Sequence, residues 1–284
     1  MVFCGERNIN FHSPNIGEAL EFLMMLHTQG FSYSSINSAR SALSAILKVS
    51  KGGHNFGSHP LTTRFLKGIY ETRKPQPKYT YIWDASKVLH YLESLQPLEN
   101  LTLKDLTLKL VMLVLLVTGQ RGQSVFLLSL EGMSMQPDLC SFTLLEHTKT
   151  SKPSGKTQPI LIRGFPSNRN ICPLTTLKEY IARTQPFRGD ERKLFVSFIK
   201  PHKGVSRDTI SRWTKSVLKK AGIDTSKFAG HSTRAAVASK AKAKDIPLDV
   251  ILSTIGWSSA DTFHKFYYKP IFGERTVADA LLSG

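Results

Sequence analysis

Four side chains in this 284-residue sequence are of types that bind or attack phosphate esters. His231 and Arg234 stand three residues apart in His-Ser-Thr-Arg, so on a helix both would lie on one face. Arg121 follows the most apolar stretch of the chain, and Tyr267 lies in the run Thr-Phe-His-Lys-Phe-Tyr-Tyr-Lys-Pro. Arginine can hold phosphate oxygens in pairs, and tyrosine can act as a nucleophile. Taken singly, each residue has a structural alternative: a solvated helix face, a carboxylate-paired arginine, or an aromatic core residue.

The charge of the chain favours a polyanionic partner. Lys and Arg number 38 against 21 Asp and Glu, which gives a formal net charge of +17. A field of this sign attracts nucleic acid. An anionic membrane is the rival partner, but it normally requires a basic amphipathic helix or a lipidation motif, and we find neither. On charge alone we therefore expect nucleic acid as the partner and no membrane, with a merely solubilising basic surface as the alternative.

The cysteines and the apolar segments argue for an intracellular protein. Cys4, Cys140 and Cys172 are far apart and without Cys-x-x-Cys spacing, which favours reduced thiols over disulfides or a zinc site. The longest apolar run, 110–117, is far shorter than a bilayer requires and predicts a buried helix.

The order of the motifs is more specific than any one of them. An arginine, a lysine in a hairpin loop, His-x-x-Arg, Gly-Trp and then a tyrosine resemble the tyrosine recombinase family of phage integrases and Cre- and Xer-type enzymes. The resemblance spans nearly the whole chain. The amino-acid sequences of segments 32–44 and 257–267 most resemble those of recombinases from eukaryotic mobile elements of the DIRS, Ngaro and Crypton kinds. Relatives have more chain before the segment matching 3–10, so we expect the natural chain to extend before Met1.

The resemblance implies a set of catalytic residues, with no metal and no cofactor. Position by position, the matches are Arg121, Lys149, His231, Arg234, Trp257 and Tyr267. The arginines and Trp257 would bind the phosphate, Tyr267 would attack it, and His231 is the candidate base. Lys149 would protonate the leaving 5′ oxygen, with Lys152 and Lys156 as alternatives.

Two positions depart from the family's pattern. Ser124 stands where many members have an acidic residue three positions after the first arginine. The tyrosine follows Trp257 by ten residues, whereas nine is common in bacterial relatives. Position nine is Phe266, which cannot attack, and position eleven is Tyr268, which remains a rival nucleophile.

The elements that must position these residues form two predicted domains. We expect a helical clamp domain over 1–74, a basic, proline-containing linker over 75–82 and a catalytic domain over 83–284. The domain class is mainly α with a small antiparallel sheet (α+β). Expected helices cover 15–29, 35–48, 61–70, 84–94, 103–117, 176–183, 208–221, 233–243, 248–255 and 259–268. Expected strands lie near Met133 and over 141–147 and 157–162, the last two joined by a lysine-containing loop.

The sequence predicts a site-specific DNA recombinase or integrase that works through a 3′-phosphotyrosine, for integration or excision of a mobile element. The resemblance implies a homodimer or homotetramer on DNA, and nuclear localisation if the source is eukaryotic. The stretch 276–282 could dock into a neighbouring subunit or pack on its own core. The alternatives are a catalytically inactive, domesticated DNA-binding protein and strand cleavage like that of a type IB topoisomerase.

Overall fold

The computed structural model describes residues 2–47, 55–74, 79–146 and 158–273 of the chain. It divides into two compact units, residues 1–78 and 79–284. Residues 79–82, assigned above to the linker, belong to the second unit, and Ile82 is fully buried there.

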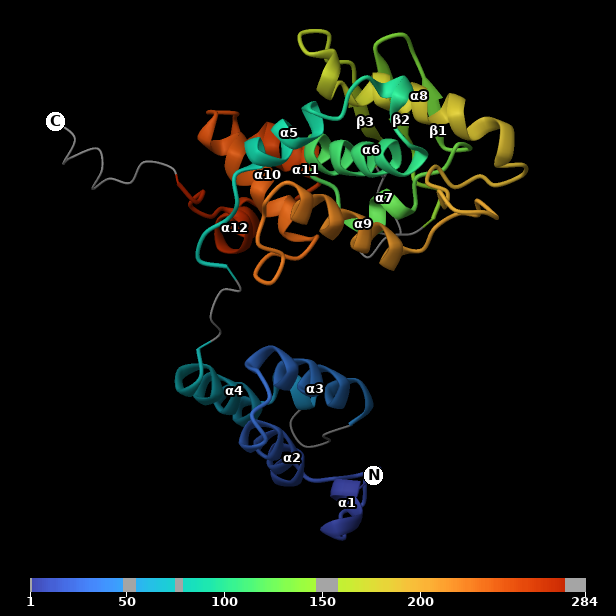
Figure 1. The fold of residues 1–284 in the computed structure, drawn as a ribbon. Coiled ribbons are helices and arrows are strands. Elements are labelled where there is room, and N and C mark those ends of the chain that lie inside the picture. Colours follow the sequence, from blue (N-terminus) through green and yellow to red (C-terminus); the bar gives the residue numbers. More distant parts are fainter. Residues whose placement is uncertain (1, 48–54, 75–78, 147–157, 274–284) are drawn as a thin grey trace, which may run out of the picture. The chain divides into compact units, whose positions relative to one another are not determined.

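In its described residues, the first unit contains helices and no strand, as predicted (Figure 1). It contains α1 (Val2–Glu6), α2 (Ile16–Thr28), α3 (Tyr33–Ile46) and α4 (Pro60–Thr72). Asn15 and Glu18 form a capping box at the start of α2, and a proline opens α4. The short α1 was not expected, because five residues are too few to display a helical period.

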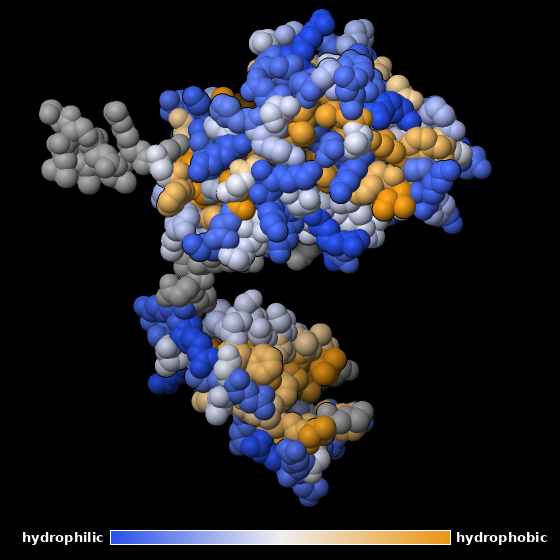
Figure 2. Space-filling view, viewed as in Figure 1, coloured by the Kyte–Doolittle hydropathy of each residue, from blue (hydrophilic) through white to orange (hydrophobic). Residues whose placement is uncertain are grey.

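The core of the first unit is small. Its buried apolar residues are Ala19, Leu23, Ile36, Leu47, Phe56, Leu66 and Ile69. Other apolar side chains, among them Met24, Phe31 and Leu61, remain exposed, and Figure 2 shows apolar surface among polar residues on the visible face of this unit. A unit of this size necessarily leaves more of its apolar surface in contact with water.

The second unit is built around α6 (Leu103–Thr118), which is buried along most of its length. The helix begins at the capping residue Thr102 and ends at Gly119, whose φ of 58° lies in the left-handed region. Around it lie α5 (Ala85–Glu93), α7 (Gly122–Phe126), α8 (Pro173–Thr184) and α9 (Arg207–Lys220) (Figure 1). The five-residue α7 was also not expected from the sequence.

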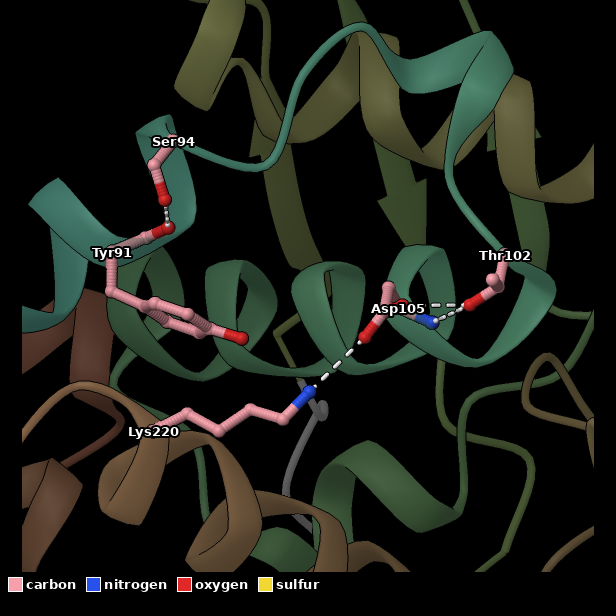
Figure 3. A network of polar contacts seen from close by, with 5 residues as sticks. All are labelled: Tyr91, Ser94, Thr102, Asp105 and Lys220. Atoms are coloured by element: carbon pink, nitrogen blue, oxygen red, sulfur yellow. Dashed lines mark hydrogen bonds and ion pairs between the residues drawn. The ribbon is translucent and has the colours of Figure 1, made fainter.

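A polar contact joins α6 to α9 (Figure 3). Lys220 Nζ lies 3.2 Å from Asp105 Oδ1, and the Thr102 hydroxyl donates to Asp105 Oδ2 at 2.7 Å. Partial burial acts to raise the pKa of Asp105, but the hydrogen bonds from Thr102 and Lys220 outweigh it and lower that pKa. The carboxylate therefore holds the capping residue Thr102 at the start of α6 and connects that helix to α9.

A three-stranded antiparallel sheet accompanies the helices. The strands β1 (Met133–Met135), β2 (Leu139–Phe142) and β3 (Ile160–Arg163) pair in sequence order. The second strand was predicted too late, at 141–147. Its register pairs Phe142 with both Met133 and Ile160, so Phe142 is the last residue of the ladder.

The chain ends in shorter helices that carry several predicted site residues. These are α10 (Ser232–Ala243), α11 (Leu248–Ile255), α12 (Ala260–Thr262) and a π-helical turn over Phe263–Tyr267. The single α-helix predicted for 259–268 was therefore wrong in its second half. After the turn, Pro270 and Phe272 pair with Ile82 through backbone hydrogen bonds of 2.9 and 2.8 Å.

Within the described part of the chain, no helix is both long enough and apolar enough to cross a bilayer.

Candidate active site

Arg234 lies at the centre of the candidate site, in the first turn of α10. Its side chain is 4% exposed. One terminal nitrogen donates to the Gly119 carbonyl at 2.9 Å, and the other donates to the Ile255 carbonyl at 3.0 Å. The planar guanidinium fork therefore bridges the carboxyl ends of α6 and α11.

Both helices end in a way that presents these carbonyls to Arg234. Gly119 and Gly256 adopt φ values of 58° and 75°, a conformation that glycine reaches without steric cost. Gly119 also lacks room for a side chain, because a Cβ would lie 2.7 Å from Ile255 Cγ1. Each helix dipole places partial negative charge at its carboxyl end, so both ends favour a cation there.

Carbonyl groups stabilise this cation without neutralising it. Among the described residues, no carboxylate forms an ion pair with Arg234. Burial and the nearby charge of Arg121 lower the pKa of Arg234 to about 10, against an opposing interaction with Tyr267. A buried charge is costly unless it is paired, so a bound anion would relieve this site.

Trp257 and Tyr267 cover the same guanidinium. Arg234 Cζ lies 4.7 Å from the Trp257 ring centroid and 5.7 Å from that of Tyr267. The two rings contact each other at 4.4 Å between centroids. The indole nitrogen of Trp257 and Nε of Arg234 are buried and have no hydrogen-bond partner among the described residues. Two unused donors thus lie beside the phenol.

The rival nucleophile Tyr268 and the neighbouring Phe266 point elsewhere. Tyr268 packs on Phe263, with 5.4 Å between ring centroids and 24° between ring planes, and is 47% exposed. Phe266 is 60% exposed. The geometry brings Tyr267, rather than either neighbour, to Arg234.

Arg121 and His231 both lie at helix starts. Arg121 is the residue before α7 and is partly exposed, and it forms no ion pair with a carboxylate among the described residues. Its charge acts on Arg234. Ser124, the position that departs from the family's pattern, is buried in α7. His231 is the exposed residue that precedes α10.

The predicted catalytic lysine, Lys149, lies outside the described residues, as do its alternatives Lys152 and Lys156. The segment 276–282, for which docking was considered, also lies outside them. In the described ranges, no cluster of three or more His, Cys, Asp or Glu could hold a metal ion.

Sequence reasoning missed the residues that hold this arrangement together. The Trp83 indole donates to the Ser232 hydroxyl at 2.9 Å, inside the core. Ser239 contacts the backbone on both sides of Tyr268, at Tyr267 and Lys269. Neither residue belongs to a motif that could have indicated such contacts, because each partner is distant in sequence.

The arrangement can bind one oxyanion and present one phenol to it. Arg234, Arg121 and Trp257 offer positive charge and N–H donors, and Tyr267 offers a nucleophilic oxygen. Such a site suits attack on a phosphodiester, in which charge develops on the non-bridging oxygens.

The sequence of this chain is similar to that of a known family. The model of the phage integrase family matches residues 85–272. None of the curated proteins matches the sequence.

Several solved structures share the fold, and three are typical. A XerH site-specific recombinase bound to difH substrate, in a pre-cleavage complex, has a TM-score of 0.57 at 14% identity and covers 88% of this chain. This chain covers 66% of XerH. The Tn1549 transposon integrase with transposon right end DNA has a TM-score of 0.61 at 13% identity. The match covers 95% of this chain and 84% of the integrase chain. A lambda integrase dimer bound to a COC′ core site has a TM-score of 0.55 at 16% identity. The match covers 97% of this chain and 88% of the lambda integrase chain. These similarities confirm the predicted fold class.

Proposed function

This chain belongs to the phage integrase family, and on that premise we propose that it is a site-specific DNA recombinase. It would cut and rejoin DNA through a 3′-phosphotyrosine intermediate formed by Tyr267. The observation that carries the proposal is the buried guanidinium of Arg234, which lacks a carboxylate partner among the described residues and lies under the Tyr267 ring.

The proposed reaction is an in-line displacement at phosphorus. The Tyr267 oxygen forms a bond to phosphorus as the bond to the 5′ oxygen breaks. The phenol proton passes to His231, and the departing 5′ oxygen takes a proton from Lys149. Arg121 and Arg234 stabilise the charge that develops on the non-bridging oxygens, an effect commonly worth about 10²–10³ in rate for each group.

Rejoining runs the same step in reverse. A 5′ hydroxyl gives its proton back to Lys149 and attacks the phosphotyrosine, the P–O bond to Tyr267 breaks, and the phenol recovers its proton from His231. Because the phosphotyrosine conserves the ester bond, neither ATP nor another energy source is required. A free phenol has a pKa of about 10, so the base and the cationic surroundings are needed for attack near neutral pH.

The proposal extends to substrate, assembly and origin. The net charge of +17 and the transposon right end DNA bound by the Tn1549 transposon integrase support double-stranded DNA as the substrate. The lambda integrase dimer supports assembly of two or more copies on DNA. The resemblance to DIRS, Ngaro and Crypton recombinases favours integration or excision of a eukaryotic mobile element, and hence work in the nucleus.

Trapping the covalent intermediate tests this function. Duplexes that bind the protein are selected from a random-sequence pool, nicked, incubated with the protein and separated on denaturing gels. We expect a DNA-linked protein with the wild type, and sequencing of the attached DNA gives the cleavage site. Strand exchange between two such duplexes would distinguish recombination from mere relaxation of supercoiled DNA.

Substitution of the two neighbouring tyrosines identifies the nucleophile. Tyr267→Phe should abolish the adduct and leave DNA binding unchanged, because the ring that covers Arg234 is retained. Tyr268→Phe is the matched control and should still form the adduct, because its ring packs on Phe263. If only Tyr268→Phe lost the adduct, Tyr268 would be the nucleophile and the assignment to Tyr267 would be wrong. DNA binding by the wild type without any adduct would favour an inactive DNA-binding protein.

A further inference from the structure

One buried hydroxyl group holds the backbone that carries Tyr267. Ser239 Oγ donates to the Tyr267 carbonyl at 3.2 Å and accepts from the Lys269 amide at 3.0 Å. The side chain is 1% exposed. We propose that Ser239 is a positioning residue, which fixes the nucleophile's peptide relative to Arg234. The inference rests on the recombinase function proposed above.

The partners of Ser239 are unusual for a serine within a helix. Serine in a helix interior commonly bonds to the carbonyl four residues earlier in its own helix. Ser239 instead bonds to a segment that is 28 to 30 residues away in the sequence. The hydroxyl thus connects α10 to another part of the chain.

The Tyr267 segment needs such a partner because its own helix stops there. The π-helical turn covers Phe263–Tyr267, and the Tyr268 amide donates to the Phe263 carbonyl at 2.8 Å. Carbonyl groups in the last turn of a helix have no partner within the helix. Ser239 satisfies the Tyr267 carbonyl and the first amide beyond Tyr268, and therefore fixes the backbone where the turn ends.

The same helix carries the cation that the nucleophile must approach. Arg234 and Ser239 are five residues apart on α10, a rise of about 7.5 Å along a rigid helix. Arg234 contacts the Tyr267 ring, and Ser239 contacts the Tyr267 backbone. The placement of the phenol relative to the guanidinium is therefore set by one element.

The segment has a second attachment that does not depend on Ser239. Ile82 pairs with Pro270 and Phe272, and the next residue, Trp83, donates to Ser232 at the start of α10. Replacement of Ser239 should therefore shift the Tyr267 peptide locally without releasing the chain that follows. We expect Ser239→Ala to fold.

The test compares two variants that each lose one buried hydroxyl. Ser239→Ala removes both contacts to the Tyr267 segment. Thr176→Val is the control, because Thr176 is fully buried and its hydroxyl donates to the carbonyl of Cys172, the residue that caps the start of α8. For each protein, the single-turnover rate of adduct formation and the DNA concentration at half-saturation are measured on the selected nicked duplex. Hydrogen exchange of the Lys269 amide is followed without DNA.

If Ser239 positions the nucleophile, its loss should change the rate of adduct formation and the Lys269 amide exchange but not the affinity for DNA. We expect Ser239→Ala to form the adduct about 10- to 100-fold more slowly at unchanged half-saturation, since a misplacement of about 1 Å can cost 10²-fold. The Lys269 amide should exchange at least about tenfold faster. Thr176→Val should change none of the three quantities.

Other outcomes overturn the inference in distinguishable ways. An equal rate in the two variants shows that Ser239 does not position the nucleophile, and a parallel loss of DNA affinity shows a merely structural role. If the wild type forms no adduct, the recombinase function fails and the positioning role fails with it. Hydrogen exchange then reports whether the Ser239 contacts exist in solution.

Discussion

Arg234 carries a positive charge that the described residues stabilise but do not neutralise. Two carbonyls accept from its terminal nitrogens, two aromatic rings lie against it, and its Nε has no partner among those residues. A carboxylate at this place would compete with a phosphate for the guanidinium. Carbonyls at helix ends hold the side chain in one orientation and leave its net charge available to an anion.

This geometry predicts that lysine cannot replace the arginine. Arg234→Lys keeps the charge but has a single nitrogen, which cannot bridge Gly119 and Ile255 and also contact a phosphate. We expect adduct formation to fall by about 10²-fold or more, whereas DNA affinity should change much less, because the substitution leaves the net charge of +17 unchanged. The measurement is the single-turnover rate on the selected duplex, and near wild-type rates in Arg234→Lys would contradict the bridging role.

At the scale of elements, α6 contains a buried lysine whose burial lowers the stability of the folded protein by a measurable amount. Lys109 is fully buried, and its ammonium donates to the Leu95 carbonyl at 2.6 Å. Burial lowers its pKa to about 8, with partial compensation from Glu93. Because the folded-state pKa lies below the unfolded value of 10.5, the unfolded chain binds more protons between pH 8 and 10.5.

The stability of the wild type should therefore rise relative to Lys109→Met as pH increases through this range. The gain in the free energy of unfolding, relative to Lys109→Met, should approach about 3 kcal/mol by pH 10.5, because each unit of pKa difference between the folded and unfolded states is worth about 1.36 kcal/mol. Urea denaturation of both proteins at pH 7, 9 and 10 measures the difference, in which the other titrating groups cancel. A difference that stays constant with pH would show that Lys109 titrates normally in the folded protein.

The π-helical turn explains how a spacing of ten residues can serve the site. A π turn contains one residue more than the α turn it replaces. The additional residue is absorbed between Phe263 and Tyr267, so that Tyr267 reaches Arg234 while Phe266 remains exposed. A one-residue-shorter α-helical turn would direct the following tyrosine the same way, which matches the nine-residue spacing common in bacterial relatives.

Deletion of Phe266 should consequently be tolerated. The deletion removes a side chain that is 60% exposed, converts the π turn to an α turn and leaves the tyrosine directed at Arg234. We expect adduct formation to persist within about tenfold of the wild type. Insertion of one alanine after Phe266 is the control and should abolish the adduct, because the turn already holds one additional residue. Loss of activity in the deletion variant would show that the π turn has another role.

The limits of sequence-based prediction are clearest at this level. Most helix bounds followed from apolar spacing and from stop signals such as Gly119 and Gly256. The π turn was missed, because five residues are too few to separate its period from that of an α-helix. The convergence of the Gly119 and Ile255 carbonyls on Arg234 was also missed. It joins residues up to 115 positions apart, and only tertiary packing determines it.

For the whole molecule, the question is which subunit supplies the nucleophile to a given phosphate. Tyr267 contacts Arg234 of its own chain, and Ser239 and Ile82 attach the flanking backbone to the same unit. These contacts would all have to break before the tyrosine could enter a neighbouring subunit. We therefore expect each subunit to cleave with its own tyrosine.

Mixing one inactive variant with one strongly impaired variant tests this expectation. Tyr267→Phe keeps the phosphate-binding residues, and Arg234→Lys keeps the tyrosine. If the nucleophile acts within its own subunit, an equimolar mixture on the selected duplex should form no more adduct than Arg234→Lys alone, because no subunit holds both residues. If it acts between subunits, the tyrosine of one variant would complete the site of the other, and the mixture would recover a substantial fraction of the wild-type adduct.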